Sequence, residues 1–157
     1  MQKTTKLTHG QIVLLLGKIP FFRAFDMTEK EQLVQHAAFY VAKDGEKIVE
    51  QGSLDHDFYI LLSGTAAVSL EHNPTELAEV GPGDFFGEIS FILNTPRSSH
   101  ITAKTLCILL QVNRRMLGNL GPGVREKFKD QIIFKLANMV LGANDNSAST
   151  QQEMGSE

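Results

Sequence analysis

The segment from residue 38 to residue 112 constrains the fold of this chain most, because short apolar runs alternate there with turn residues. Each apolar run is too short for an ordinary helix and has the length of a strand. The predicted strands cover residues 39–42, 47–50, 58–62, 66–70, 77–80, 101–103 and 106–112. Glycine-containing turns separate them, as at Asp44-Gly45, Ser63-Gly64 and Gly81-Pro82-Gly83-Asp84. Many short strands divided in this way predict a β-sandwich, roll or barrel.

Two helices are predicted before the strands. An amphipathic segment from about Thr8 to Lys18 predicts the first of them. The segment Thr28-Glu29-Lys30-Glu31 has the spacing of a capping box, in which two side chains bond the first amides of a helix. The second helix is therefore expected to begin at Thr28.

Two more helices are predicted after the strands. Asn113 can cap a short helix, which Gly121-Pro122-Gly123 interrupts, and a longer helix then runs to about Leu141. The apolar arc of this helix is wide, so either all of it packs on the β region or part of it covers a ligand or a second copy of the helix. Gly142 suits a helix end, and residues 143–157 are polar without an apolar period, which predicts a disordered tail or a linker.

Length, charge and the single cysteine limit the classes of function. A chain of 157 residues with 42% hydrophobic side chains suits one globular domain. The formal net charge is -3 without a block of like charges, so a nucleic-acid surface is not expected. No segment has the length and apolar character of a membrane span or a secretory core. Cys107 lies in an apolar run and is expected to be buried in a reducing compartment, which favours a cytoplasmic protein.

Residues 83–103 carry the most informative pattern, in which a glycine-rich turn opens a short helical stretch and an arginine precedes a strand. Gly87 has no Cβ, so its backbone can approach a ligand closely, and the amides that follow favour a phosphate. Arg97 supplies a permanent charge that can hold two phosphate oxygens, and Ser98 adds a hydroxyl. Glu88 accepts hydrogen bonds when ionised, which suits a ribose hydroxyl and a counter-charge for Arg97. Together these residues predict a site for a sugar phosphate.

This pattern resembles the cyclic nucleotide-binding domain family, whose phosphate-binding cassette has Phe-Gly-Glu, an apolar helical turn, then Pro-Arg and small residues. Other motifs in the family's order are Ile19-Pro20-Phe21-Phe22, Gly45-Glu46-Lys47-Ile48-Val49, Gln51-Gly52 and Phe58-Tyr59-Ile60-Leu61-Leu62-Ser63-Gly64. The resemblance covers about Ile19 to Leu141. It implies a mainly β fold, an eight-stranded antiparallel β-roll of the jelly-roll kind, with N-terminal helices and a C-terminal lid helix. The expected organisation is an N-terminal helix in 1–18, the binding domain in 19–142 and the tail in 143–157.

The resemblance also implies a role for each residue of the cassette. The backbone amides of Gly87 and Ile89 would face the ligand, and Glu88 would bind the ribose 2′-hydroxyl. Arg97 and Ser98 would hold the cyclic phosphate. The expected ligand-binding residues are Phe86, Gly87, Glu88, Ile89, Ser90, Arg97, Ser98 and Ser99. The last of these is a serine where alanine is usual in the family.

The function implied by the resemblance is that of a regulatory sensor with no catalytic activity, no metal and no cofactor besides its ligand. In the family a threonine after the arginine tends to favour guanine, whereas serine is compatible with cAMP, so cAMP is expected to bind in preference to cGMP. Binding is expected to reposition the C-terminal helix. The recipient of that signal is an effector domain, a separate protein, or a second protomer held through this helix. Met139 and Val140 stand at a suitable distance for a lid residue over the base.

Three alternatives compete with this hypothesis. A cupin-like metalloenzyme would need clustered histidines, but the five histidines form no His-x-His pair. A transcription factor with a winged helix is not expected, because no apolar period follows Leu141. A degenerate module would keep the fold and bind a partner protein without a nucleotide, and the presence of Gly87, Glu88 and Arg97 disfavours it.

Overall fold

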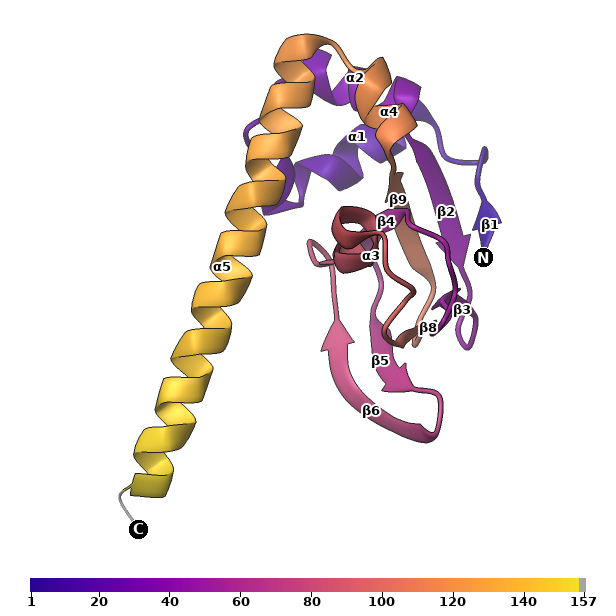
Figure 1. Ribbon diagram of the computed structural model, residues 1–157. Coiled ribbons are helices and arrows are strands. Elements are labelled where there is room, and N and C mark those ends of the chain that lie inside the picture. Colours follow the sequence, from indigo (N-terminus) through magenta and orange to yellow (C-terminus); the bar gives the residue numbers. More distant parts are fainter. Residues whose placement is uncertain (156–157) are drawn as a thin grey trace. The chain divides into compact units, whose positions relative to one another are not determined.

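The computed structural model describes residues 1–155, with Pro74 and residues 143–155 described by their backbone alone. The chain divides into two units, Met1–Gly121 and the segment from Pro122 onward. The first unit holds two antiparallel β-sheets with helices before, between and after their strands (Figure 1). The second unit is formed by the helix α5 (Pro122–Gly155).

The helices before the sheets begin at well-defined caps. They are α1 (His9–Gly17), the 3-10 turn η1 (Pro20–Phe22) and α2 (Met27–His36). The Thr8 hydroxyl accepts a hydrogen bond from the Gln11 amide at 3.1 Å, which caps α1 as expected. The Asp26 carboxylate accepts from the Glu29 amide at 2.9 Å, and the Glu29 carboxylate accepts from the Asp26 amide at 3.0 Å. The capping box predicted at Thr28 is therefore wrong by two residues, because Asp26 and Glu29 have the same spacing two residues earlier.

Nine strands are present in the described residues, one more than the resemblance implied. They are β1 (Gln2–Lys3), β2 (Ala38–Ala42), β3 (Lys47–Val49), β4 (Phe58–Ser63), β5 (Ala66–Leu70), β6 (Asn73–Val80), β7 (Phe85–Phe86), β8 (His100–Ala103) and β9 (Cys107–Val112). The larger sheet has the order β1-β2-β9-β4-β7 and the smaller one the order β3-β8-β5-β6. The predicted class, a mainly β fold of antiparallel strands with flanking helices, is confirmed. β6 begins at Asn73, before the strand start predicted at residue 77.

One apolar core lies between the sheets, because alternate side chains of their strands face inward. Ile48 and Ile101 of the smaller sheet and Leu61 and Leu109 of the larger one are buried in it. Cys107 is fully buried in the same core, as predicted, and its thiol donates to the Thr65 carbonyl at 3.2 Å. Burial raises the pKa of this thiol, so it stays protonated and unreactive at neutral pH.

Aromatic packing fixes the position of the short helix α3 (Glu88–Leu93), which follows β7. The Phe91 ring of α3 contacts the Phe58 ring of β4 edge to face, with their centres 4.9 Å apart. Phe58 also contacts Phe85 of β7, at 5.7 Å between ring centres. The turn between β7 and α3 is therefore held against the larger sheet at both of its ends.

For the helices after β9, the predicted start at Asn113 matches the structure and the predicted end at Gly142 does not. Asn113 caps α4 (Arg114–Asn119), since its side-chain oxygen accepts from the Met116 amide at 2.9 Å. The helix α5 continues to Gly155, so the predicted helix end at Gly142 and the predicted disorder of 143–155 differ from the structure. A glycine inside a helix costs only about 1 kcal/mol relative to alanine, and no proline follows it, so nothing local stops the helix there. Residues 156–157, which complete the predicted tail, lie outside the described residues.

Candidate functional site

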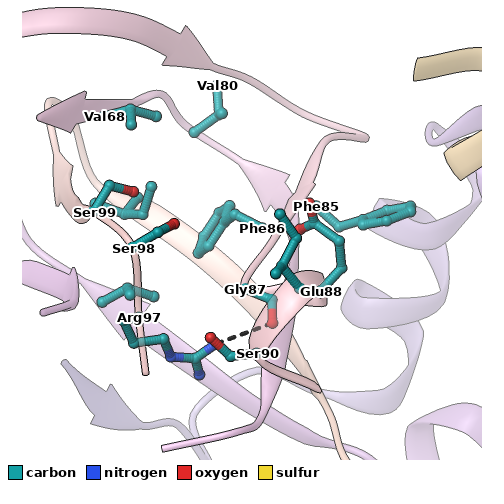
Figure 2. A pocket seen from close by; sticks show the side chains of 13 residues that line it. Val68, Val80, Phe85, Phe86, Gly87, Glu88, Ser90, Arg97, Ser98 and Ser99 are labelled. Atoms are coloured by element: carbon teal, nitrogen blue, oxygen red, sulfur yellow. Dashed lines mark hydrogen bonds between the residues drawn. The ribbon is translucent and has the colours of Figure 1, made fainter. Parts of the chain in front are cut away.

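All eight predicted ligand-binding residues line one hollow of about 210 Å³ in the first unit (Figure 2). Phe86 closes β7, the residues from Gly87 to Ser90 form the turn into α3, and Arg97 to Ser99 lead into β8. These two segments lie ten residues apart in sequence but face the same space, because α3 folds back between them. The sequence-based grouping of these residues is therefore reproduced by the fold.

The hollow also has an apolar wall that the sequence analysis did not identify. The residues of this wall are apolar and lie in strands of the two sheets. They are Val49, Val68, Val80, Phe85 and Ile101. Val68 and Ile101 are register partners across β5 and β8, so the smaller sheet supplies one continuous apolar face. All of them except Phe85 lie in strands predicted from the sequence, and only the pairing of the strands shows which residues border a hollow.

Gly87 is the one residue of the turn that must be a glycine on two independent grounds. Its φ angle of +84° lies in the left-handed region, where side chains are disfavoured. A Cβ atom built on Gly87 would overlap the Arg97 Nη1 atom and would lie 3.2 Å from both Arg97 Cζ and the Asp57 carbonyl oxygen. The absence of a side chain at Gly87 thus lets the guanidinium of Arg97 reach the turn.

Arg97 is held in place by both its main chain and its side chain. Its amide donates to the Ser53 carbonyl at 2.9 Å, and its carbonyl accepts from the Gly52 amide at 2.8 Å. Its guanidinium donates from Nη1 to the Gly87 carbonyl at 3.0 Å and from Nη2 to the Asp57 carbonyl. Arg97 is buried, with only 3% of its surface exposed.

The ion-pair partner of Arg97 differs from the one expected from sequence. The Asp55 carboxylate lies 3.2 Å from Arg97 Nη2, and the described residues contain no ion pair between Arg97 and Glu88. The reason lies in the loop before β4, because its bonds to the main chain of Arg97 carry Asp55 to the guanidinium. The guanidinium is therefore engaged by Gly87, Asp57 and Asp55 and not by Glu88.

The Nε atom of Arg97 is the unusual feature of this arrangement. It is buried and has no hydrogen-bond partner in the described part of the chain. A buried donor left unpaired costs free energy, about 1–3 kcal/mol for a typical group. An acceptor within hydrogen-bond distance of Nε would remove that cost, and an anionic acceptor would also be attracted by the charge.

Glu88 is half-buried at the first position of α3. Burial raises the pKa of its carboxyl above the ordinary value, while a hydrogen bond from its own amide and the charge of Arg97 lower it by less. The carboxylate is thus less stable as an anion here than in water. It can accept a hydrogen bond from a ligand hydroxyl, which would restore part of the lost solvation.

Asp55 and Asp57 both contact Arg97, and the sequence analysis named neither of them as a site residue. The Asp57 carboxylate accepts from Gln111 Nε2 at 2.8 Å, and its carbonyl accepts from Arg97. Burial and the neighbouring Asp55 charge raise the pKa of Asp57. The signal available in sequence was two acids directly before a strand, which does not by itself say that an arginine 40 residues later reaches them.

Within the described residues, no group of three or more His, Cys, Asp or Glu side chains is placed to hold a metal ion. Among the helices of that part of the chain, none is long and apolar enough to cross a membrane.

A β-roll in which a glycine turn and a buried arginine border one hollow is the arrangement of a regulatory ligand-binding domain. The family model for the cyclic nucleotide-binding domain matches residues 41–121, which include both segments of the hollow. This chain therefore belongs to the cyclic nucleotide-binding domain family.

Solved structures show the same fold at low sequence identity. A cyclic nucleotide-binding domain from Methylobacillus flagellatus is 22% identical over 88% of this chain and 81% of its own, with a TM-score of 0.73. The regulatory domain of Toxoplasma gondii PKA with cAMP is 24% identical over 83% of this chain and 50% of its own, with a TM-score of 0.63. The regulatory subunit of a cAMP-independent protein kinase A from Trypanosoma brucei is 24% identical over 83% and 46%, with a TM-score of 0.64. This chain spans about half of the length of these two kinase regulators.

Proposed function

We propose that this chain binds a cyclic nucleotide, cAMP in preference to cGMP, in the hollow beside α3 and acts as a regulatory sensor without catalytic activity. Arg97 and Ser98 hold the cyclic phosphate, and Glu88 accepts from the ribose 2′-hydroxyl. The backbone amides of Gly87 and Ile89 complete the phosphate contacts. Phe86, Ser90 and Ser99 border the ligand.

The unpaired Nε atom of Arg97 is the observation that carries this proposal. It belongs to a fixed, buried cation that borders the hollow, and it lacks an acceptor within the described residues. A phosphate oxygen supplies both the missing acceptor and the opposite charge. Ser98 lines the hollow next to it and adds a hydroxyl donor.

The preference for cAMP rests on two supports. One is Ser98, which has no threonine methyl at the position after the arginine. The other is the Toxoplasma gondii relative, whose structure contains cAMP. The proposed binding domain spans 19–142, somewhat more than the matched 41–121.

The proposed output is a shift in the population of positions of α5 relative to the β-roll. A ligand moves such an equilibrium only by its differential affinity for the two arrangements, so a preference of a few kcal/mol is sufficient. The recipient is a protein effector or a second copy of the chain. Hydrogen exchange of the amides from 122 to 142 should change when saturating cAMP is added; unchanged exchange would remove this part of the proposal.

Titration calorimetry with cAMP and with cGMP tests the binding itself, on the natural chain and on Arg97→Ala. Loss of a charge-assisted contact to phosphate should cost on the order of 2 kcal/mol, a loss of tenfold or more in affinity. Arg23→Ala removes an exposed arginine far from the hollow in sequence and should bind cAMP as the natural chain does. Equal losses in both variants would contradict the assigned role of Arg97.

A second candidate function is a degenerate module that keeps the fold and binds a partner protein without nucleotide. The observation that favours it is the engagement of the Arg97 guanidinium by the Gly87 carbonyl, the Asp57 carbonyl and the Asp55 carboxylate. The Trypanosoma brucei relative is described as cAMP-independent, so the fold occurs in such a protein. Absence of binding by both nucleotides at millimolar concentration would support this candidate over the first.

A further inference from the structure

A second hollow, of about 400 Å³, lies in the first unit where β2 begins and β9 ends. Ala38 and Gln111 are register partners there, so the end of α2 and the start of α4 come together (Figure 1). Lys3 of β1 reaches the same place because β1 pairs with β2. We call this space the polar hollow, and define it by Lys3, Gln35, His36, Gln111, Asn113 and Arg115. It shares no lining residue with the candidate nucleotide site.

The side chains around the polar hollow are one-sided in charge. Lys3 and Arg115 are cationic, and no Asp or Glu is among the lining residues. Neither of these two forms an ion pair in the part of the chain that the structure describes, whereas Arg97 and Lys104 do. This concentration of positive charge occurs on a chain whose formal net charge is -3. Like charges around one space repel each other, and a bound anion would relieve that repulsion.

The amides of the polar hollow are held in fixed positions by the network behind it. Gln111 Nε2 donates to the Asp57 carboxylate at 2.8 Å. The Asn113 side-chain oxygen accepts from the Met116 amide at 2.9 Å. Both side chains are therefore engaged by hydrogen bonds within the protein, and the cationic Lys3 and Arg115 line the same hollow.

We propose that the polar hollow is a second anion site, which binds a small phosphate-bearing ligand such as pyrophosphate or a phosphate ester. Lys3 and Arg115 supply the charge, and the guanidinium fork of Arg115 suits two oxygens of one phosphate. Gln35 and His36 add hydrogen-bond donors at the end of α2. The site shares no lining residue with the candidate nucleotide site, so its occupancy can be measured without a cyclic nucleotide.

Calorimetric titration of the full chain with sodium pyrophosphate tests the site. The natural chain should show saturable binding at one site, weakened about tenfold or more in the double variant Lys3→Gln with Arg115→Gln. The control double variant, Arg23→Gln with Lys129→Gln, removes two exposed charges outside the polar hollow and should bind within about twofold of the natural chain. Absence of saturable binding, or equal weakening in both double variants, would overturn the proposal.

Amide chemical shifts measured during the same titration separate the two sites. Shifts at residues 35–36 and 111–115 are expected from binding in the polar hollow. Shifts confined to residues 86–90 and 97–99 would mean that pyrophosphate enters the candidate nucleotide site instead, and would also overturn the proposal. Circular dichroism confirms that each double variant is folded before it is compared.

Discussion

The guanidinium of Arg97 joins the loop before β4 to the turn before α3, and the site depends on this contact. It bonds the carbonyls of Gly87 and Asp57 and the carboxylate of Asp55, while its Nε lacks an acceptor among the described residues. A charge so deeply buried is kept only by such partners. The pairing sets the position of the arginine before a ligand arrives, which reduces the cost of ordering it on binding.

The substitution Gly87→Ala tests the close approach of Arg97 to the turn. The new Cβ would overlap Arg97 Nη1 and would have to adopt a φ angle near +84°, so we expect the free energy of unfolding to fall by about 1–3 kcal/mol. Urea denaturation measures the change. Gly118→Ala is the matched control, since Gly118 lies in α4 with open space around it. The control should lose no stability, and a similar loss in both variants would contradict the argument.

The raised pKa of Glu88 gives the site a pH dependence. Lowering the pH from 7 towards 5 protonates a larger fraction of this buried carboxyl than of an ordinary glutamate. The protonated carboxyl is no longer an anionic acceptor for the hydrogen bond from a ligand hydroxyl. The affinity of the natural chain for cAMP, measured by calorimetry, should therefore decrease as the pH is lowered from 7 towards 5. The affinity of Glu88→Gln should change less over the same pH range. The same pH dependence in both would show that another group is responsible.

The ionisation of Glu88 changes the stability of the ligand-free fold in the direction opposite to its effect on cAMP affinity, because the ionised carboxylate destabilises the folded state. Because its folded-state pKa lies above its unfolded value, the group favours the folded state below the unfolded pKa, and this contribution is lost as pH rises through the folded pKa. Without ligand, Glu88→Gln should therefore have a higher free energy of unfolding than the natural chain, and the difference should be larger at pH 7 than at pH 4. Parallel urea titrations at the two pH values measure this difference. A gain that does not vary with pH would contradict this assignment.

At the scale of helices and strands, local side chains set where most elements begin. Thr8, Asp26 and Asn113 each accept a hydrogen bond from an amide in the first turn of the helix that follows. The end of α5 has no comparable local signal, and the structure continues that helix past Gly142. Helix starts are therefore better determined by short-range chemistry in this chain than the last helix end.

Two substitutions at the start of α2 distinguish the observed cap, Asp26, from the cap predicted from the sequence, Thr28. Asp26→Ala removes the carboxylate that accepts from the Glu29 amide, and should lower the free energy of unfolding by about 1 kcal/mol. Thr28→Ala removes the residue first predicted as the cap, which is exposed within the first turn, and should change stability by no more than about 0.5 kcal/mol. Thermal or urea unfolding compares the two, and a larger loss for Thr28→Ala would restore the sequence-based cap.

Across the whole molecule, the helix α5 carries exposed apolar side chains at heptad-like spacing. Ile133, Phe134, Val140 and Leu141 are 59–65% exposed, and they repeat every seven residues in two pairs. A stripe of this kind in water favours a second copy of the helix as its cover. This is the arrangement expected of a homodimer formed through α5, which stays a prediction.

Light scattering at high protein concentration, with and without cAMP, tests this dimer. The natural chain should show the mass of two chains, and Phe134→Glu should shift it to the mass of one, because a carboxylate cannot be buried unpaired at the contact. Leu106→Glu is the control, since it places the same charge on an exposed apolar side chain of the first unit and should leave the dimer intact. A natural chain that is monomeric in both conditions would contradict the prediction.

The sequence determined the strands other than β1 and β7, the turn into α3 and the eight residues gathered at the hollow, because their signals are short in range. Alternating apolar residues, helix caps and a glycine before a helix act through neighbours in the chain. The Phe-Gly-Glu and Pro-Arg motifs also indicated the family, and the match of the family model to residues 41–121 confirms it.

The tertiary structure alone decided which partners Arg97 has and which valines border the hollow. Asp55 and Asp57 meet the arginine only because the loop before β4 bonds the main chain before β8, and Val68 meets Ile101 only through strand pairing. The same holds for the polar hollow, where the pairing of Ala38 with Gln111 brings distant cationic residues together. Such contacts depend on sheet order and register, which connect residues far apart in sequence, and no local pattern encodes them.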